Sequence, residues 1–431
     1  MDWFSVYKQD TSRGQKVKVP APRPAPRIII RTTSRPTVKP APSPTVKPAP
    51  SPAPKPVPKT ITYMLNDPAT PVFKTVLPPT APASPLFTVV GYKGGGDAWN
   101  TLPGQAANVY TTIVNLLNFI NTVAVRPMNG WAATRQLQVI PRAGRMLNAY
   151  YDRSTLSFFF DYNRTTGQEI RTADSSDIVS HELGHAILDF YRPELFSMPL
   201  TEIWAFHESF GDFMAIVTML LHDETVQQCL HETGGNLRQN NLICRIAEQF
   251  GAAVASVNPT QDNMSLRNAW NSLQYVDPLT LPRSSSNLQT LTSTPHSFSR
   301  VMTGALYEVM VAVYEQNCAS MPPAEALKQA VRQTVRYLLV SVANARIESR
   351  YFMRLAHGML WADHSTGGVY HDRMWDVFLR RKIITGDATS QFNWIWHAAR
   401  LLSRSTLRAT SRRVYALMVF AGQTGEAHTA R

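Results

Sequence analysis

The sequence contains few cysteines and no hydrophobic run long enough to cross a membrane. Only three of its 431 residues are cysteine, namely Cys229, Cys244 and Cys318. This sparse, odd count predicts a fold that does not depend on disulfides, although Cys229 and Cys244 could pair in a helical hairpin, and none has the spacing of a zinc site. No apolar stretch approaches the ~20 residues of a transmembrane helix, and residues 1–10 lack the apolar core of a signal peptide. We therefore expect a monomer that stays in the cytoplasm or is exported by a dedicated or non-classical route.

Acidic residues are absent between Thr11 and Asn66, although eleven lysines and arginines lie in that segment. The whole chain has a formal net charge of +13, so these eleven account for most of the excess. The rest of the chain is close to balanced. A general nucleic-acid-binding function is therefore not supported, because it would place basic residues across a folded domain.

The same basic segment is rich in proline and contains a repeat. Residues 36–43, with the sequence PTVKPAPS, recur as residues 44–51. Because proline fixes φ and removes a backbone donor, we expect residues 1–59 to form an extended polyproline-II arm without a core. We favour a passive tether. The alternative is a cationic arm that binds an anionic polymer, such as a cell wall, a membrane surface or nucleic acid.

The most informative motif is His181-Glu182-Leu183-Gly184-His185. Two histidines four residues apart on a helix project from one face, about one turn from each other. Their imidazole nitrogens can bind one Zn²⁺, and Glu182 beside them can accept a proton from water. The alternative is a helix that carries two histidines by coincidence.

A second helix is predicted over residues 201–217, with Thr201 as its N-cap. Glu208 and Asp212 lie one turn apart, and both interrupt its apolar face. Buried carboxylates are costly unless they pair or bind a metal. We predict that Glu208 is the third zinc ligand and that Asp212 accepts the second N–H of a ligand histidine. The alternative places both carboxylates in solvent. The apolar residues that define the face recur at helical spacing: Phe206, Phe210, Phe213, Met214 and Val217.

In this order, these residues resemble the thermolysin-like zinc endopeptidases of the gluzincin group. That family carries the His-Glu-x-x-His motif on one helix, a glutamate ligand on the next, and an aspartate four residues later. The matching positions are His181, Glu182, His185, Glu208 and Asp212. The resemblance extends over residues 98–384. It implies an α+β fold with two lobes, an α+β amino-terminal lobe and a mainly helical carboxy-terminal lobe, with zinc in the cleft between them.

Short matches outside the metal motif imply substrate-binding residues. Asn148 and Ala149 resemble the family's edge strand, which pairs with the substrate backbone. Arg267 resembles the arginine that contacts the substrate carbonyl beyond the scissile bond. Ile178 and Leu266 resemble the lining of the pocket just after the cut. This lining implies a preference for an apolar substrate residue at that position.

His296 resembles the family's second catalytic histidine, which stabilises the oxyanion, but the residues around it depart from the pattern. The family's oxyanion tyrosine corresponds to Phe196, which lacks a hydroxyl, and Tyr191 would need a shifted turn to replace it. No aspartate in residues 291–295 corresponds to the one that orients the histidine. No acidic cluster matches the family's calcium sites. These departures imply weaker transition-state stabilisation without affecting the metal ligands.

Periodicity assigns the remaining sequence to elements. We predict strands and loops over 60–97, a helix over 105–123, strands over 137–140 and 157–160, and helices over 298–315, 324–344, 349–357 with its continuation, and 371–384. The predicted domains are a basic arm at 1–59, an α+β lobe at 60–190 that ends in the zinc helix, a helical lobe at 191–390, and a basic extension at 391–431. In the extension, a four-residue stripe forms either a solvated helical face or a docking surface for a membrane or partner: Arg400, Arg404, Arg408 and Arg412.

The sequence therefore predicts a zinc-dependent endopeptidase. Glu182 would activate water for attack on a carbonyl of a peptide or protein substrate. Two alternatives stay open. The first is a zinc-bound scaffold without turnover that acts as a binding module. The second is a protease exported as an effector or toxin.

Overall fold

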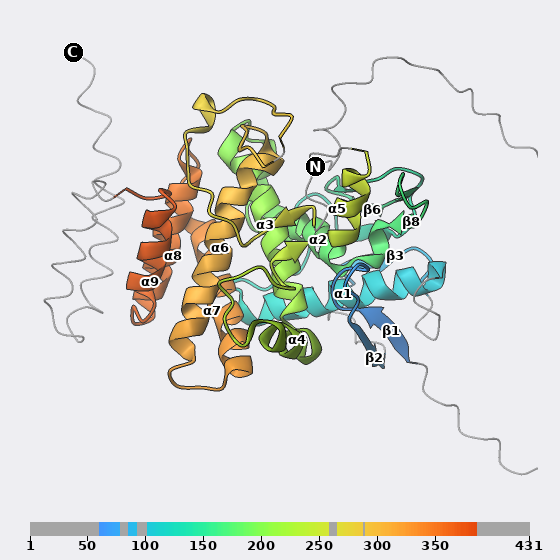
Figure 1. The fold of residues 1–431 in the computed structure, drawn as a ribbon, viewed down its shortest axis with the longest axis horizontal. Helices are drawn as coiled ribbons and strands as arrows, with labels where there is room; N and C mark the ends of the chain where they lie inside the picture. Colours follow the sequence, from blue (N-terminus) through green and yellow to red (C-terminus); the bar gives the residue numbers. More distant parts are fainter. Residues whose placement is uncertain (1–59, 78–84, 93–100, 258–264, 288, 386–431) are drawn as a thin grey trace, which may run out of the picture. The chain divides into compact units, whose positions relative to one another are not determined.

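A computed structural model describes residues 60–77, 85–92, 101–257, 265–287 and 289–385. These residues form a mixed α+β fold in which helices dominate, as predicted (Figure 1). The strands are β1 Ile61–Met64, β2 Phe73–Val76, β3 Phe87–Val89, β4 Leu137–Ile140, β5 Ala149–Tyr151, β6 Thr155–Phe158, β7 Phe160–Tyr162, β8 Glu169–Arg171, β9 Arg245–Ile246 and β10 Arg267–Asn268. The helices are α1 Leu102–Val123, α2 Ser176–Tyr191, α3 Thr201–Met219, α4 Asp223–Thr233, α5 Glu248–Ala255, α6 Pro295–Asn317, α7 Pro323–Asn344, α8 Tyr351–Ser365 and α9 His371–Arg380.

Two predicted segments lie outside the described residues. They are the basic arm at 1–59 and the extension at 391–431, including its arginine stripe. The domain boundaries proposed from the sequence therefore stay predictions at both ends of the chain.

The helix predicted over 105–123 is confirmed and begins three residues earlier. The side chain of Thr101 accepts a hydrogen bond from the Gly104 amide at 3.2 Å, and Pro103 lies in the first turn. Proline is favoured there because its missing N–H has no helical partner to lose. In α3 the predicted cap is wrong, because Thr201 is already helical and Leu200 holds the N-cap position without a side-chain hydrogen bond.

The largest sheet has four strands in the order β3-β4-β6-β5. The first three run parallel, and β5 pairs antiparallel with β6, with Ala149 opposite Phe158. The strand predicted over 137–140 is confirmed. The single strand predicted over 157–160 is wrong, because β6 ends at Phe158 and β7 begins at Phe160. The Phe159 amide donates to the Thr172 hydroxyl at 2.9 Å, and β7 pairs with β8 instead.

The approach of α2 to α3 depends on two glycines. A Cβ on Gly184 would lie 2.8 Å from the Cα of Gly211, and a Cβ on Gly211 would lie 2.8 Å from Nδ1 of His181. A larger residue at position 184 would push against the backbone of α3, and one at position 211 would displace the His181 ring. The glycines therefore allow the two helices that carry the predicted metal ligands to pack closely.

Helix α3 also packs against α6, so that it contacts neighbours on two sides (Figure 1). The Ser209 hydroxyl donates to the carbonyl of Ser299 at 3.0 Å and joins these two helices. Helix α7 packs on α6 and on α8, and α9 packs on α6 and α8. The four predicted carboxy-terminal helices are confirmed with shifted ends. Helix α8 continues to Ser365, and α9 ends at Arg380 rather than at Ile384.

The described residues contain neither a disulfide nor a helix suited to span a membrane. All three cysteines are free, Cys229 and Cys244 being buried and Cys318 exposed. The helical-hairpin disulfide between Cys229 and Cys244 is therefore not formed. Among the described residues, no helix combines the length and the apolar character that crossing a bilayer requires.

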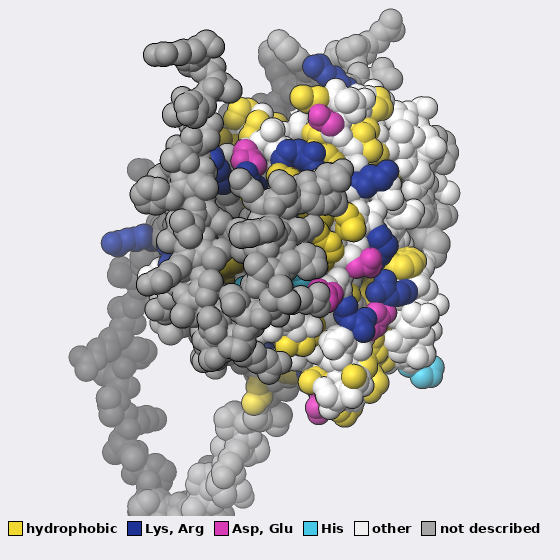
Figure 2. Space-filling model, turned by 90° about the vertical axis from the view of Figure 1, so that its left-hand side faces the viewer, with side chains coloured by type: hydrophobic (Ala, Val, Ile, Leu, Met, Phe, Trp, Pro, Cys, Tyr) yellow, Lys and Arg dark blue, Asp and Glu magenta, His cyan; other side chains and the backbone are white. Residues whose placement is uncertain are grey.

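On the face drawn in Figure 2, acidic and basic side chains lie next to one another among apolar ones. Several carboxy-terminal charges form ion pairs. Arg238 binds Glu315 at 2.6 Å, and Arg380 binds Asp376 at 2.9 Å. Charge is thus locally balanced at these positions, as the sequence predicts for the chain beyond the arm.

Candidate metal centre

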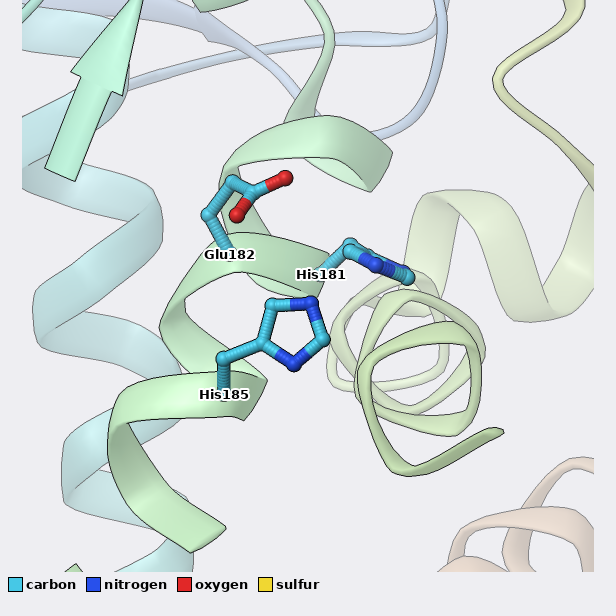
Figure 3. Close-up of side chains that lie close together, drawn as sticks. All are labelled: His181, Glu182 and His185. Atoms are coloured by element: carbon cyan, nitrogen blue, oxygen red, sulfur yellow. The ribbon is translucent and has the colours of Figure 1, made fainter. Parts of the chain in front are cut away.

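The three motif residues lie together on α2. This helix begins after Ser175, whose hydroxyl accepts a hydrogen bond from the Ile178 amide at 3.4 Å. His181, Glu182 and His185 project from neighbouring positions of the helix (Figure 3), and one ligand atom of each lies within 4.8 Å of the others. All three side chains are buried. This group can hold a metal ion, as the motif predicts.

Glu208 faces both histidines from α3. Its carboxylate oxygens lie 3.5 Å from Nε2 of His181 and 3.7 Å from Nε2 of His185. Glu208 and Asp212 are 1 % and 0 % exposed, so the alternative in which both carboxylates face solvent is wrong. Burial alone would raise the pKa of Glu208, but His296, His181 and His185 hold it well below the ordinary value. Glu208 is therefore an ionised carboxylate between imidazoles.

Asp212 lies one helical turn beyond Glu208 and orients His181. Its Oδ1 lies 3.0 Å from Nδ1 of His181, which leaves Nε2 of that ring directed at Glu208. Asp212 also accepts hydrogen bonds from the Arg267 guanidinium, at 2.8 Å from Nε, and from the Thr303 hydroxyl at 3.1 Å. The predicted partnership between Asp212 and a motif histidine is present in the structure. A carboxylate in this position sets the histidine tautomer and ring orientation.

The two motif histidines have different electrostatic environments. Burial alone lowers the pKa of His181, but its hydrogen bonds with Asp212 and Glu208 raise the pKa to about 9. For His185, burial dominates over the attraction of Glu208 and lowers the pKa well below the ordinary value. Burial also raises the pKa of Asp212, but Arg267 and His181 outweigh it and lower that pKa. The buried cluster therefore contains three carboxylates, from Glu182, Glu208 and Asp212, together with the motif histidines and the Arg267 guanidinium.

His296 joins the same cluster from the first turn of α6. Its Nε2 lies 3.2 Å from Oε2 of Glu208, and 17 % of its side chain is exposed, more than for His181, His185 or Glu208. Its Nδ1 is buried, and no described side chain hydrogen-bonds to it. The structure therefore places His296 beside the predicted metal ligands, and it lacks a carboxylate orienter, as the sequence indicates.

Arg267 is brought to the site, although its guanidinium is committed to Asp212. It lies on β10, opposite Ile246 of β9. The substrate contact that the family resemblance implies for Arg267 stays a prediction. What the structure shows is an arginine that neutralises the carboxylate behind His181.

The other predicted substrate residues lie on three different elements. Ala149 is the first residue of β5, an edge strand of its sheet, and Asn148 directly precedes it. Ile178 is buried in the first turn of α2, and Leu266 is half-buried just before β10. Their roles in substrate binding stay predictions. The edge position of β5 leaves one side of that strand without a partner strand among the described residues.

Neither predicted oxyanion position supplies a hydroxyl in the structure. The Tyr191 hydroxyl donates to the carbonyl of Arg126 at 2.9 Å. Phe196 packs against Tyr151 and His207, with ring centroids 5.9 Å away in each case. The Tyr191 hydroxyl is therefore hydrogen-bonded to the segment after α1 and does not replace the missing tyrosine.

Two residues of the site are not evident from the sequence. Thr303 on α6 bonds Asp212 from a position 91 residues away, so no local pattern indicates it. His207 directly precedes Glu208, and its ring lies 5.8 Å from that of His185. In the sequence, the indication for His207 was its position next to the expected ligand Glu208. The position of a residue on its helix does not by itself show which side chain of another helix it contacts.

The donor set of the site fits zinc. Imidazole nitrogen and carboxylate oxygen are ligands that Zn²⁺ commonly takes, with three protein ligands in sites that perform catalysis. Two imidazoles that share one buried, ionised carboxylate satisfy this requirement.

No protein-family model matches the chain, and no curated protein is significantly similar to it.

Proposed function

We propose that this protein is a zinc-dependent endopeptidase of the thermolysin-like kind. The observation that carries the proposal is the convergence of the buried side chains of His181 and His185 on Glu208, with Asp212 behind His181. Burying an ionised carboxylate costs several kcal/mol unless it is paired or bound to metal. A cation held by His181, His185 and Glu208 would offset that cost and explain why these polar groups lie in the core.

When bound, zinc supplies Lewis-acid polarisation of the substrate carbonyl and lowers the pKa of water. The residues of the chain carry the remaining chemistry. Glu182, next to the two histidines, accepts a proton as the oxygen of water forms a bond to the peptide carbon. The same carboxyl group then delivers that proton to the leaving nitrogen as the carbon–nitrogen bond breaks. Water is consumed, and the products are one carboxylate and one amine.

His296 would stabilise the oxyanion. Its ring lies within the cluster at 3.2 Å from Glu208, and it is the partly exposed member. A hydrogen-bond donor directed at developing charge in a site with little water lowers the barrier more than it lowers the energy of bound substrate. Because Phe196 and Tyr191 supply no second hydroxyl, we assign this stabilisation by a side chain to His296.

The substrate is an extended peptide in this proposal. The free edge of β5, with Asn148 and Ala149, would accept it as an added strand. Ile178 and Leu266 would line the pocket after the cut and favour an apolar side chain there. The sheet with α2 and the helices from α3 onward would form the two lobes on either side of the metal.

One alternative is a zinc-binding scaffold that has no turnover. The observation that favours it is the incomplete oxyanion machinery, since Nδ1 of His296 has no partner among the described residues. The retained Glu182 favours the enzyme, because a binding module has no need of a general base. The exported effector or toxin protease predicts the same chemistry with a different route to its substrate.

The test combines metal content with peptide cleavage. Purified protein, His185→Ala and Glu182→Gln are loaded with zinc and incubated with a peptide library, with and without chelator. We expect one zinc per chain in the wild-type and Glu182→Gln proteins and little zinc in His185→Ala. Cleavage should occur only in the wild-type protein and should stop with chelator. Zinc binding without cleavage of any peptide would support the scaffold, and full zinc in His185→Ala would refute the ligand assignment.

A further inference from the structure

His207 is a fully buried histidine without a hydrogen bond. Its side chain is 0 % exposed, and neither ring nitrogen has a partner among the described residues. Burying a polar group without a hydrogen-bond partner lowers stability, because the group loses its hydrogen bonds to water. His207 therefore lowers the stability of the metal-free protein. A state of the site in which a ring nitrogen of His207 forms a hydrogen bond would remove this cost.

The ring of His207 lies near the ring of His185. The two ring centroids are 5.8 Å apart, at an interplanar angle of 39°. Nε2 of His185 faces Glu208 at 3.7 Å, whereas its buried Nδ1 has no partner among the described residues. Two unsatisfied imidazoles thus lie side by side, and one of them is a predicted metal ligand.

The two motif histidines differ in whether Nδ1 of the ring has a hydrogen-bond partner among the described residues. Nδ1 of His181 has Asp212 at 3.0 Å, which fixes the ring with Nε2 directed into the site. A histidine that binds metal through one nitrogen carries a hydrogen on the other, and that N–H almost always donates to a nearby acceptor. His185 needs such an acceptor, and a neutral imidazole has one.

We propose that His207 is the positioning residue for His185 and accepts the hydrogen bond of its Nδ1–H when metal occupies the site. This inference rests on the proposed metal-binding function and adds a specific role to it. The site would then use two different orienting groups, a carboxylate for His181 and an imidazole for His185. A neutral acceptor adds no negative charge to a buried cluster that already holds Glu182, Glu208 and Asp212.

The ring of His207 is held by packing as well as by the helix. Phe196 contacts it in a T-shaped arrangement at 5.9 Å, and the Arg153 guanidinium lies over Phe196 at 4.9 Å. Arg153 in turn binds Asp189 with two hydrogen bonds, at 3.0 and 2.9 Å. Because Asp189 lies on α2, one turn after His185, the layer that supports His207 is tied to the same helix as the ligand that it orients.

The test uses two substitutions with opposite expectations. His207→Leu removes both nitrogens, whereas His207→Asn keeps an acceptor at the position. The measurements are the unfolding temperature of the metal-free protein and the zinc dissociation constant from competition with a chelator. We expect His207→Leu to be at least as stable as wild type without metal, because an unsatisfied polar group is removed. We expect its zinc dissociation constant to rise by about 10–100-fold.

His207→Asn should bind zinc within a few-fold of wild type, because it retains the acceptor. His222 provides a matched control, since it is a buried histidine whose ring packs on Tyr63 rather than on the cluster. His222→Leu should leave the zinc dissociation constant unchanged.

Several outcomes would overturn the inference. Unchanged zinc affinity in His207→Leu would show that another group orients His185. A fall in metal-free stability and in zinc affinity that is the same for both His207 variants would show a role in packing alone. A wild-type protein that binds no zinc would refute both this inference and the proposed function. Zinc binding that depends on residue 207, without any peptide cleavage, would refute the endopeptidase and support the inference.

Discussion

At the scale of single residues, the site depends as much on two small residues as on its ligands. Gly184 and Gly211 face each other where α2 and α3 approach, and the His181 ring fills the space that a side chain on Gly211 would occupy. The close approach of these helices places Glu208 within 3.5 Å of His181 and 3.7 Å of His185. The arrangement of the candidate ligands is thus determined by helix packing.

The first prediction concerns Gly211. Gly211→Ala should lower the unfolding free energy, because overpacking costs about 1–3 kcal/mol and exceeds the ~1 kcal/mol that alanine contributes in a helix. Zinc affinity should fall as well, since His181 has to move. Thermal unfolding and a zinc competition assay would measure both effects. Gly130→Ala is the control, because nothing lies within 4 Å of its added Cβ. Equal behaviour of the two variants would contradict the packing argument.

The second prediction concerns His296. If this residue alone supplies a side-chain donor to the oxyanion, His296→Ala should lower kcat by roughly 10²–10³-fold with little change in KM. Zinc content should be unchanged, because His296 is not one of the three predicted ligands. Steady-state kinetics on a cleaved peptide would measure the effect. A His296→Ala enzyme with nearly normal kcat would assign the oxyanion to another residue.

At the scale of helices and strands, a buried glutamate joins α3 to α8. Glu202, in the first turn of α3, accepts a hydrogen bond from the Tyr275 hydroxyl at 2.6 Å and one from the Phe352 amide at 2.9 Å. The Phe352 amide belongs to the first turn of α8, where backbone donors lack helical partners. Glu202 therefore satisfies one end of α8 while anchoring the start of the helix that carries Glu208.

The third prediction is a pH dependence. Burial raises the pKa of Glu202 from 4.5 to about 7. The folded protein thus holds this proton more tightly than the unfolded chain, so the contribution of Glu202 to stability falls as the pH rises from 4.5 to about 7. Glu202→Gln mimics the protonated form and should remove this fall, which is on the order of 3 kcal/mol. Denaturant unfolding of both proteins on either side of this window would measure it. The same pH dependence in wild type and Glu202→Gln would contradict the assignment.

At the scale of the whole molecule, the described residues form one unit and the proline-rich arm precedes them in the sequence. The repeat of the arm, residues 36–51, consists of proline, alanine, threonine, valine, lysine and serine and contains no leucine, isoleucine, methionine or aromatic side chain. Such a composition cannot bury enough apolar area to offset the entropy of ordering it. The sequence therefore assigns the arm no part in the core of the folded unit.

The fourth prediction follows from that composition. Deleting residues 1–59 should leave the unfolding temperature, the zinc affinity and the cleavage of small peptides unchanged. Calorimetry and kinetics on the full-length and truncated proteins would measure this. A truncated protein that unfolds earlier, or that loses turnover on small peptides, would show that the arm packs on the unit and would refute the tether.

Local patterns in the sequence predicted α1, α2, α3 and α6 to α9 and the identity of the candidate ligands, but they did not predict α4 or α5. Apolar residues at helical spacing predicted α1, α3 and α6 because one face of each helix is buried, and burial repeats with the helical period. The spacing of His181 and His185 placed both rings on one face for the same reason. A buried carboxylate such as Glu208 was conspicuous because it interrupts an apolar stripe.

Only the tertiary structure decided which distant groups meet. The division between β6 and β7 arises because Phe159 bonds Thr172, and the Asp212 network includes Thr303 from a helix far along the chain. His207 acquires its neighbour only when α2 and α3 pack, since the two rings come from different helices. Sequence periodicity specifies the side of an element on which a residue lies. The contacts across that side depend on the close approach of backbones, which two glycines make possible here.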